Sequence, residues 1–135
     1  MTCSGPMAEF ETMQLPAEPT VVAPDGSDVR VLLRLAGGSM AHFSLAPGET
    51  SKAVRHRTVE EVWYVVGGRG QMWRRQDGRS EVVDLVPGTC LTIPLGVDFQ
   101  FRSTGRDPLG IIGATVPAWP GEDEAILVEG CPDWI

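Results

Sequence analysis

Short runs in which apolar and polar residues alternate recur from residue 29 to residue 116, and Gly or Pro residues separate one run from the next. In residues 29–35, apolar side chains share one face and two arginines lie on the other. Successive side chains of a β-strand point to opposite faces of its sheet, so this period of two predicts strands with one buried face. Nine such runs are present, at residues 29–35, 39–45, 52–57, 61–66, 71–75, 81–85, 89–93, 99–103 and 109–116.

Many short strands leave many unpaired edges, which a sandwich or a closed barrel hides. The 16 Gly and 11 Pro residues are a fifth of the 135 residues and are spread along the chain, which leaves little room for long helices. Asp77-Gly78 is the strongest hairpin signal. A chain of this length forms one domain, and the sequence predicts an all-β fold for it.

The two ends of the chain differ from its middle in charge. All 11 basic residues lie between Arg30 and Arg106, whereas residues 1–28 and 116–135 hold only acidic charges. The acidic ends either lie against the more basic middle or are two solvated tails. We expect an N-terminal arm at residues 1–28, a barrel at residues 29–116 and a Pro- and Trp-containing C-terminal flap at residues 117–135.

Charge and hydropathy exclude several classes of partner. The net charge of −7 repels phosphate backbones, and no basic patch interrupts it, so nucleic acid is not expected to bind. The chain has no apolar run of ~18 residues and no signal-peptide pattern in its first thirty residues. Cys3, Cys90 and Cys131 are odd in number and lack CxxC spacing, which predicts free thiols. We therefore expect a cytoplasmic protein that binds no membrane.

Two stretches of the sequence carry a motif at specific spacings. Residues 47–68 contain Pro-Gly, then His56, Glu61 and a closing Gly, and residues 87–103 begin with a second Pro-Gly. These spacings resemble the first and second motifs of the cupin superfamily, of the single-domain, conserved-barrel cupin 2 type. With the flanking strands, the resemblance extends over about residues 29–116. It implies a small antiparallel jelly-roll barrel with a pocket inside, usually in a homodimer.

The resemblance also implies where a metal would bind, and this chain departs from that pattern. Metal-binding cupins use two His and one Glu of the first motif and one His of the second, and these positions fall on Val54, His56, Glu61 and Phe99. Valine and phenylalanine have no lone pair to donate, and a catalytic metal site needs about three protein ligands. We expect a degenerate metal site and no cofactor. A divalent metal held by His56, Glu61 and His42 is the disfavoured alternative, because strand alternation directs His42 away from the pocket unless a bulge intervenes.

Strand alternation predicts which side chains face the pocket. His56 and Glu61 are the candidate catalytic residues, because a buried imidazole and a buried carboxyl are costly unless they are paired. We expect them to hydrogen-bond to each other or to a ligand, and an ionised pair would keep the imidazole protonated. The alternative is a pair that is satisfied by water and has no function. The candidate ligand-binding residues, which otherwise simply fill a barrel core, are Phe43, Val54, Trp63, Met72, Phe99, Phe101, Thr115 and Trp119.

Three functions are consistent with these residues. The leading hypothesis is a small-molecule-binding cupin that acts as a metal-independent acid–base enzyme, of the isomerase or cyclase type, on a small apolar or aromatic substrate. The second is a noncatalytic ligand-binding or sensor cupin, and the third is a metal-dependent oxygenase with an atypical ligand set. Arg102 is a candidate for the pocket rim, where it would attract an anionic ligand. Tyr64 and Trp73 are expected at the homodimer interface, where aromatic residues are enriched.

Overall fold

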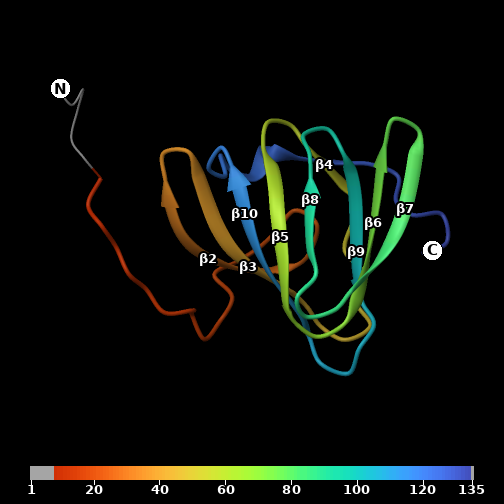
Figure 1. Ribbon diagram of the computed structural model, residues 1–135, viewed down its shortest axis with the longest axis horizontal. Helices are drawn as coiled ribbons and strands as arrows, with labels where there is room; N and C mark the ends of the chain where they lie inside the picture. Colours follow the sequence, from red (N-terminus) through yellow and green to blue (C-terminus); the bar gives the residue numbers. More distant parts are fainter. Residues whose placement is uncertain (1–7, 135) are drawn as a thin grey trace.

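The computed structural model describes residues 8–134, which form two antiparallel sheets with the core between them (Figure 1). The six-stranded sheet has the order β1 (Val21–Val22), β2 (Asp28–Leu35), β3 (Gly38–Leu45), β10 (Leu109–Val116), β5 (Glu60–Gly67) and β8 (Cys90–Ile93). The five-stranded sheet has the order β11 (Ala125–Leu127), β4 (Val54–His56), β9 (Asp98–Ser103), β6 (Gly70–Gln76) and β7 (Arg79–Leu85).

The predicted all-β fold is confirmed. Each of the nine predicted runs contains one strand, from β2 to β10. Within residues 8–134 the one helical element is a short 3-10 turn, η1 (Glu122–Glu124). No helix in this part of the chain has the length and apolarity needed to cross a membrane.

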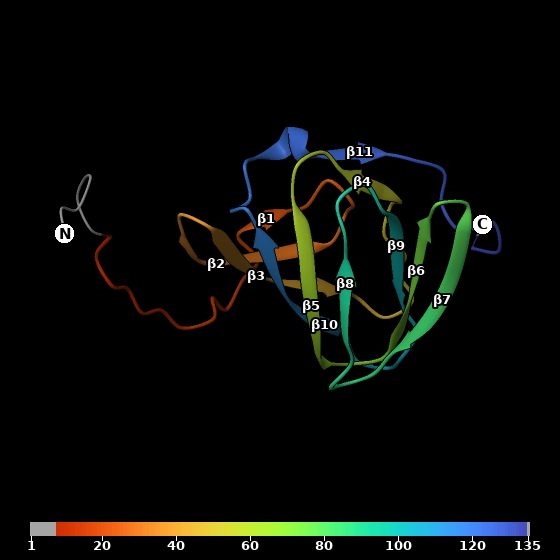
Figure 2. The ribbon, with the colours of Figure 1, turned by 45° about the horizontal axis from the view of Figure 1, so that its top comes forward.

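Both end segments add a strand to the edge of a sheet. β1 pairs with β2, and β11 pairs with β4, so one edge strand of each sheet comes from outside residues 29–116. Before β1, the chain from residue 8 extends away from the body of the molecule (Figure 2). The side chain of Phe10 in this extended segment is fully exposed.

Alternation in the central strands places one face of each in the core. In β5, Glu61, Trp63 and Val65 are buried, while the residues between them are exposed. The same period was expected throughout residues 29–35, but the pairing of β2 with β3 shifts register between Val31 and Arg34. A bulge of this kind redirects the side chains that follow it. The expected buried face is lost before the shift as well as after it, since Val31 is 49% exposed and Leu35 is 71% exposed.

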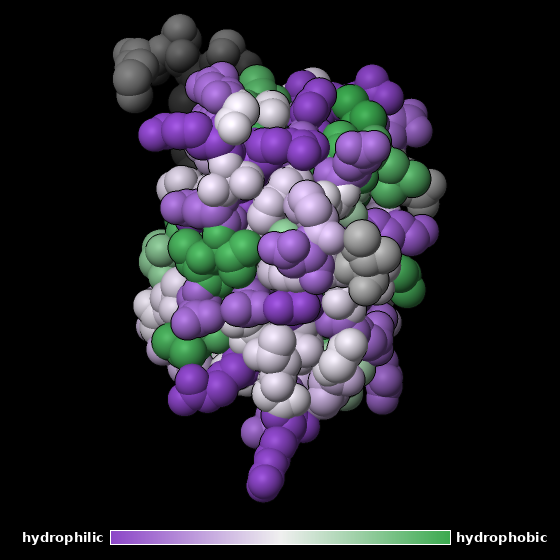
Figure 3. Space-filling view, turned by 90° about the vertical axis from the view of Figure 1, so that its right-hand side faces the viewer, coloured by the Kyte–Doolittle hydropathy of each residue, from purple (hydrophilic) through white to green (hydrophobic). Residues whose placement is uncertain are grey.

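Of the two aromatic residues that were expected at a homodimer interface, one does not lie on the outer surface of its sheet. Trp73 is buried, with the guanidinium of Arg75 4.9 Å from its ring centroid, so it is not a surface aromatic residue as expected. Tyr64 is half exposed on the outer face of the six-stranded sheet. On the side where β7 lies, hydrophilic residues predominate and hydrophobic ones form small separate groups (Figure 3). Cys90 and Cys131 are free thiols, and Cys3 lies outside the described residues.

Candidate functional site

A cavity of about 240 Å³ lies inside the barrel, between the two sheets and the segment that carries β1. Its wall includes both candidate catalytic residues, His56 at the end of β4 and Glu61 near the start of β5. Six of the eight candidate ligand-binding residues also line it: Phe43, Val54, Trp63, Phe99, Thr115 and Trp119. Strand alternation therefore brings together residues that are as far apart in sequence as Phe43 and Trp119.

The other two candidates, Met72 and Phe101, do not line the cavity. They face each other across the β6–β9 pairing, and both are fully buried in the hydrophobic core. Alternation had placed them correctly on the inner face of the five-stranded sheet. They lie outside the cavity because neighbouring core side chains fill the space around them, and a period of two cannot distinguish a filled core from an open one.

The carboxyl group of Glu61 binds Trp63, and not His56. Trp63 Nε1 donates a hydrogen bond to Glu61 Oε2 at 2.6 Å. Among the described residues, no partner is present for Glu61 Oε1 or for the buried Nδ1 of His56. The expected ionised His–Glu pair is therefore wrong for the unliganded cavity, and each residue keeps an unpartnered polar atom there.

Burial moves the pKa values of these two residues in opposite directions. Burial lowers the pKa of His56 from 6.5 to about 4, against a smaller opposing effect of the negative charge of Glu124. Burial raises the pKa of Glu61 from 4.5 to about 8, and the hydrogen bond from Trp63 only partly opposes this. At neutral pH the cavity thus holds an unprotonated imidazole and a protonated carboxyl group.

An unbroken series of aromatic rings forms the cavity wall. Phe43 stacks on Trp63 with ring centroids 5.4 Å apart, and Trp63 meets Phe99 edge-on at 5.8 Å. The His56 ring lies edge-on against both Phe99 and Trp119, at 5.2 Å and 5.3 Å. The stacked pair depends on Gly113 in β10, because a Cβ atom there would lie 2.5 Å from the Phe43 ring.

Two hydrogen-bond groups hold the C-terminal segment against the cavity. Trp119 N donates to Ser39 Oγ at 2.9 Å, and that hydroxyl also pairs with Thr115. Glu124 accepts hydrogen bonds from the backbone N–H groups of Thr58 and Val59 and from the Thr58 hydroxyl. Burial alone would raise the pKa of Glu124, but these donors lower it, so its carboxylate is ionised beside His56.

Sequence reasoning missed Asp25, which lines the cavity from the segment between β1 and β2. It is 8% exposed, and its Oδ1 accepts hydrogen bonds from Ser27 N at 2.9 Å and Ser27 Oγ at 2.7 Å. The Asp25-Gly26 dipeptide signals a turn in the sequence. This turn closes the local hairpin of β1 and β2, and nothing in the hairpin itself shows that it meets the barrel, where Lys52 N donates to the carbonyl oxygen of Asp25 at 2.7 Å.

The residues at the four metal-ligand positions do not fit a metal ion. Val54 and Phe99 lie side by side in the pairing of β4 with β9, both line the cavity, and neither has a donor atom. His42 lines a different hollow on the outer face of the sheet, near Gly110. In the part of the chain that the structure describes, no three His, Cys, Asp or Glu side chains are grouped as a metal site would require.

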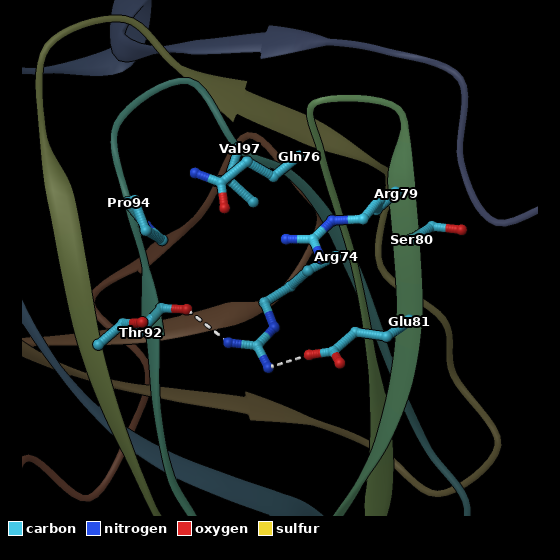
Figure 4. A pocket seen from close by; sticks show the side chains of 8 residues that line it. All are labelled: Arg74, Gln76, Arg79, Ser80, Glu81, Thr92, Pro94 and Val97. Atoms are coloured by element: carbon cyan, nitrogen blue, oxygen red, sulfur yellow. Dashed lines mark hydrogen bonds and ion pairs between the residues drawn. The ribbon is translucent and has the colours of Figure 1, made fainter.

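A second hollow, of about 350 Å³, lies between β6, β7 and β8 and differs in charge from the barrel cavity (Figure 4). Arg74 and Arg79 line it, and Arg74 donates to Thr92 O and to Glu81 Oε1, each at 2.7 Å. The barrel cavity, by contrast, has no Lys or Arg among its described lining residues.

Arg102 was a candidate for the rim of the barrel cavity. It instead donates to Gln71 Oε1 and lies over the Trp134 ring, so that expectation is wrong.

Comparisons with known proteins agree with this architecture. The family model for the cupin domain matches residues 41–113, slightly more than half of the chain. An uncharacterized protein of Methanocaldococcus jannaschii is 28% identical over 111 residues, which are 78% of this chain and 86% of that protein. The xanthan biosynthesis protein XanB of Xanthomonas campestris pv. campestris is 30% identical over 87 residues, which are 64% of this chain. The match covers only 18% of the length of XanB.

A solved structure shows the same fold at low sequence identity. A conserved protein with a double-stranded β-helix domain from Klebsiella pneumoniae superposes with a TM-score of 0.68 at 16% identity. The superposition covers 90% of this chain and 99% of that one. At this identity the likeness shows the fold alone.

Proposed function

The chain belongs to the cupin domain family, and on that premise we propose that it is a small-molecule-binding cupin that catalyses an acid–base reaction in its barrel cavity. The reaction is of the isomerase or cyclase type, and it needs no metal. One observation carries this proposal: a buried imidazole and a buried carboxyl group line one aromatic cavity, and each keeps a polar atom without a partner.

The protonation states suit a proton transfer at neutral pH. The unprotonated His56 accepts a proton from the substrate, and the protonated Glu61 donates one to it. Two groups whose surroundings separate their pKa values in this way supply a base and an acid at the same pH. The bond from Trp63 Nε1 positions the Glu61 carboxyl group, and the rings on both sides of His56 limit its rotation.

A substitution at His56 tests the acid–base reaction. Any molecule that native mass spectrometry detects bound to the purified protein is added back to ligand-free protein in D2O, and NMR follows deuterium incorporation into it. We expect His56→Gln to slow incorporation by about 10²-fold or more while the affinity for this molecule changes little. His42→Gln, the same substitution on the outer face of the sheet, should leave the rate unchanged. A wild-type protein that binds the molecule without exchange is a noncatalytic binder or sensor, which contradicts the proposal.

Metal analysis tests the metal-independent part of the proposal. Protein purified without chelator should contain well under one equivalent of iron, copper, zinc, manganese or nickel, because Val54 and Phe99 occupy two ligand positions. Stoichiometric metal that is lost on His56→Gln substitution would favour the metal-dependent oxygenase instead.

We further propose that the chain forms a homodimer, for which the apolar outer face of the six-stranded sheet provides the surface.

A further inference from the structure

We infer that the ligand of the barrel cavity is a small organic cation, held by the aromatic rings of the wall and by the carboxyl group of Asp25. This inference rests on the proposed function, because it names the chemical class of the molecule that the same cavity binds. The charges, the ring geometry and the unpartnered polar atoms of the cavity all support it.

The titratable side chains that line the cavity are two carboxyl groups and one imidazole, and none of them carries a positive charge at neutral pH. Asp25 and Glu61 are 8% and 4% exposed and both line it, and the ionised Glu124 lies close enough to affect the pKa of both Glu61 and His56. No described lining residue is a Lys or Arg. A buried carboxylate is stabilised by hydrogen-bond donors or by a positive charge, and a bound cation supplies the positive charge that the lining residues do not. An anionic ligand would instead be repelled.

The rings provide surfaces that attract a cation. The quadrupole of an aromatic ring attracts a cation that lies over its face, and the attraction is stronger when the site is shielded from water. Phe43 and Trp63 stack nearly parallel, at 26°, while Phe99 meets Trp63 at 83°. The rings therefore enclose the cavity from more than one direction. With Trp119 on a further side, they form an aromatic cage beside the two carboxyl groups.

Asp25 is the carboxyl group best placed to meet the cation as an anion. Two hydrogen bonds from Ser27 reach its Oδ1 and stabilise the ionised form, although burial raises its pKa. The backbone of Asp25 is fixed as well, because Lys52 N donates to its carbonyl oxygen at 2.7 Å. Glu61 has one donor, Trp63, and so remains the proton donor of the proposed reaction.

A pair of probes with the same shape but different charge tests this inference. Choline and 3,3-dimethyl-1-butanol differ in that a quaternary nitrogen in the first is a quaternary carbon in the second. Isothermal titration calorimetry on the wild-type protein should give a dissociation constant about tenfold lower for choline. An equal or lower dissociation constant for the alcohol would overturn the inference and leave the proposed small-molecule binding intact.

Two Asp→Asn variants test whether Asp25 causes the preference for choline over the uncharged alcohol. Asp25→Asn keeps the oxygen that accepts from Ser27 and should bring the ratio of the two dissociation constants close to one. The matched control Asp84→Asn removes an exposed charge from β7 and should preserve the wild-type ratio. A ratio that Asp25→Asn leaves unchanged overturns the role of Asp25. If Asp25→Asn does not fold, the wild-type ratio still decides the charge preference. If neither probe binds, the cation inference fails, while deuterium incorporation decides the proposed function separately.

Discussion

Burial gives two titratable side chains of the cavity protonation states that their sequence positions do not reveal. An exposed Glu is ionised at pH 7, but Glu61 has a pKa of about 8 because its carboxyl group is removed from water. Between pH 4.5 and 8, the folded state therefore binds more protons at Glu61 than the unfolded state does. The stability that this protonated carboxyl contributes is complete below pH 4.5 and is lost as the pH rises through 8.

We predict that the free energy of unfolding falls by about 2 kcal/mol between pH 6.5 and pH 8 in the wild-type protein and not in Glu61→Gln. The titration of His56 affects stability at lower pH. Because its pKa is lowered from 6.5 to about 4 in the folded state, it reduces the free energy of unfolding as the pH drops from 6.5 through 4. Urea unfolding at both pH values measures the difference. The exposed neighbour Glu60 provides a control, since Glu60→Gln should retain the wild-type dependence. If the free energy of unfolding changed equally between the two pH values in wild type and in Glu61→Gln, the Glu61 carboxyl group would be ionised in the folded protein.

Among the elements, the segment from η1 to β11 is attached to the barrel by the backbone pairing of β11 with β4 and by the carboxylate of Glu124. Glu124 joins this segment to the turn between β4 and β5, and the same turn precedes Glu61. Its neighbour Asp123 has an exposed side chain and contributes only its backbone oxygen, which accepts from Arg57. The position of Trp119 against His56 therefore depends on both the Ser39 contact and this carboxylate.

We predict that Glu124→Ala lowers the free energy of unfolding by about 2 kcal/mol, because it leaves the part-buried N–H group of Thr58 and the buried N–H group of Val59 without an acceptor. Hydrogen exchange followed by NMR should show faster exchange at these two amides. Asp123→Ala, one residue away, should change neither quantity. Unchanged protection at Thr58 and Val59 in Glu124→Ala would mean that the turn holds its conformation without the carboxylate.

At the scale of the whole molecule, the two outer sheet faces differ in polarity. Val62, Tyr64 and Val66 on β5 are each about half exposed, and Val62 lies opposite Ala114 of β10. Met40 of β3 lies on the other side of Ala114 and is also exposed. These neighbouring side chains form a continuous apolar surface across three strands, which is the kind of surface that protein interfaces cover.

We predict that wild-type protein elutes with twice the 14.6 kDa mass of one chain and that Val62→Asp elutes as a monomer. Size-exclusion chromatography with light scattering measures both masses. A charge placed in the apolar centre of an interface is left buried without a partner, which opposes association. Val82→Asp is a matched control, since Val82 is 44% exposed and Val62 is 46% exposed, but Val82 lies on β7 of the other sheet. Identical masses for wild type and Val62→Asp would contradict this interface.

The sequence by itself determined the strands, their inner faces and most of the cavity wall. Alternation depends only on the geometry of an extended chain, so the inner positions of β5 and β10 follow directly from the residue order. The spacing of His56 and Glu61 after Pro47-Gly48 likewise predicted the cupin family and two polar residues of the cavity. The absence of donor atoms at Val54 and Phe99 follows from residue type alone.

Only the tertiary structure decided which inward side chains meet empty space and which polar groups pair. Met72 and Phe101 share the alternation of the cavity residues but are enclosed by core side chains, and Trp63 is the hydrogen-bond partner of Glu61. Asp25 lies in the turn between β1 and β2 and reaches the cavity where Lys52 N, remote in sequence, donates to its carbonyl oxygen. For Met72, Phe101 and Asp25, packing and hydrogen bonding depend on distances between residues that are remote in sequence, and a local period contains no information about them. Trp63 is only two residues from Glu61, but which donor meets a carboxyl group depends on side-chain positions, and these are not part of the period either.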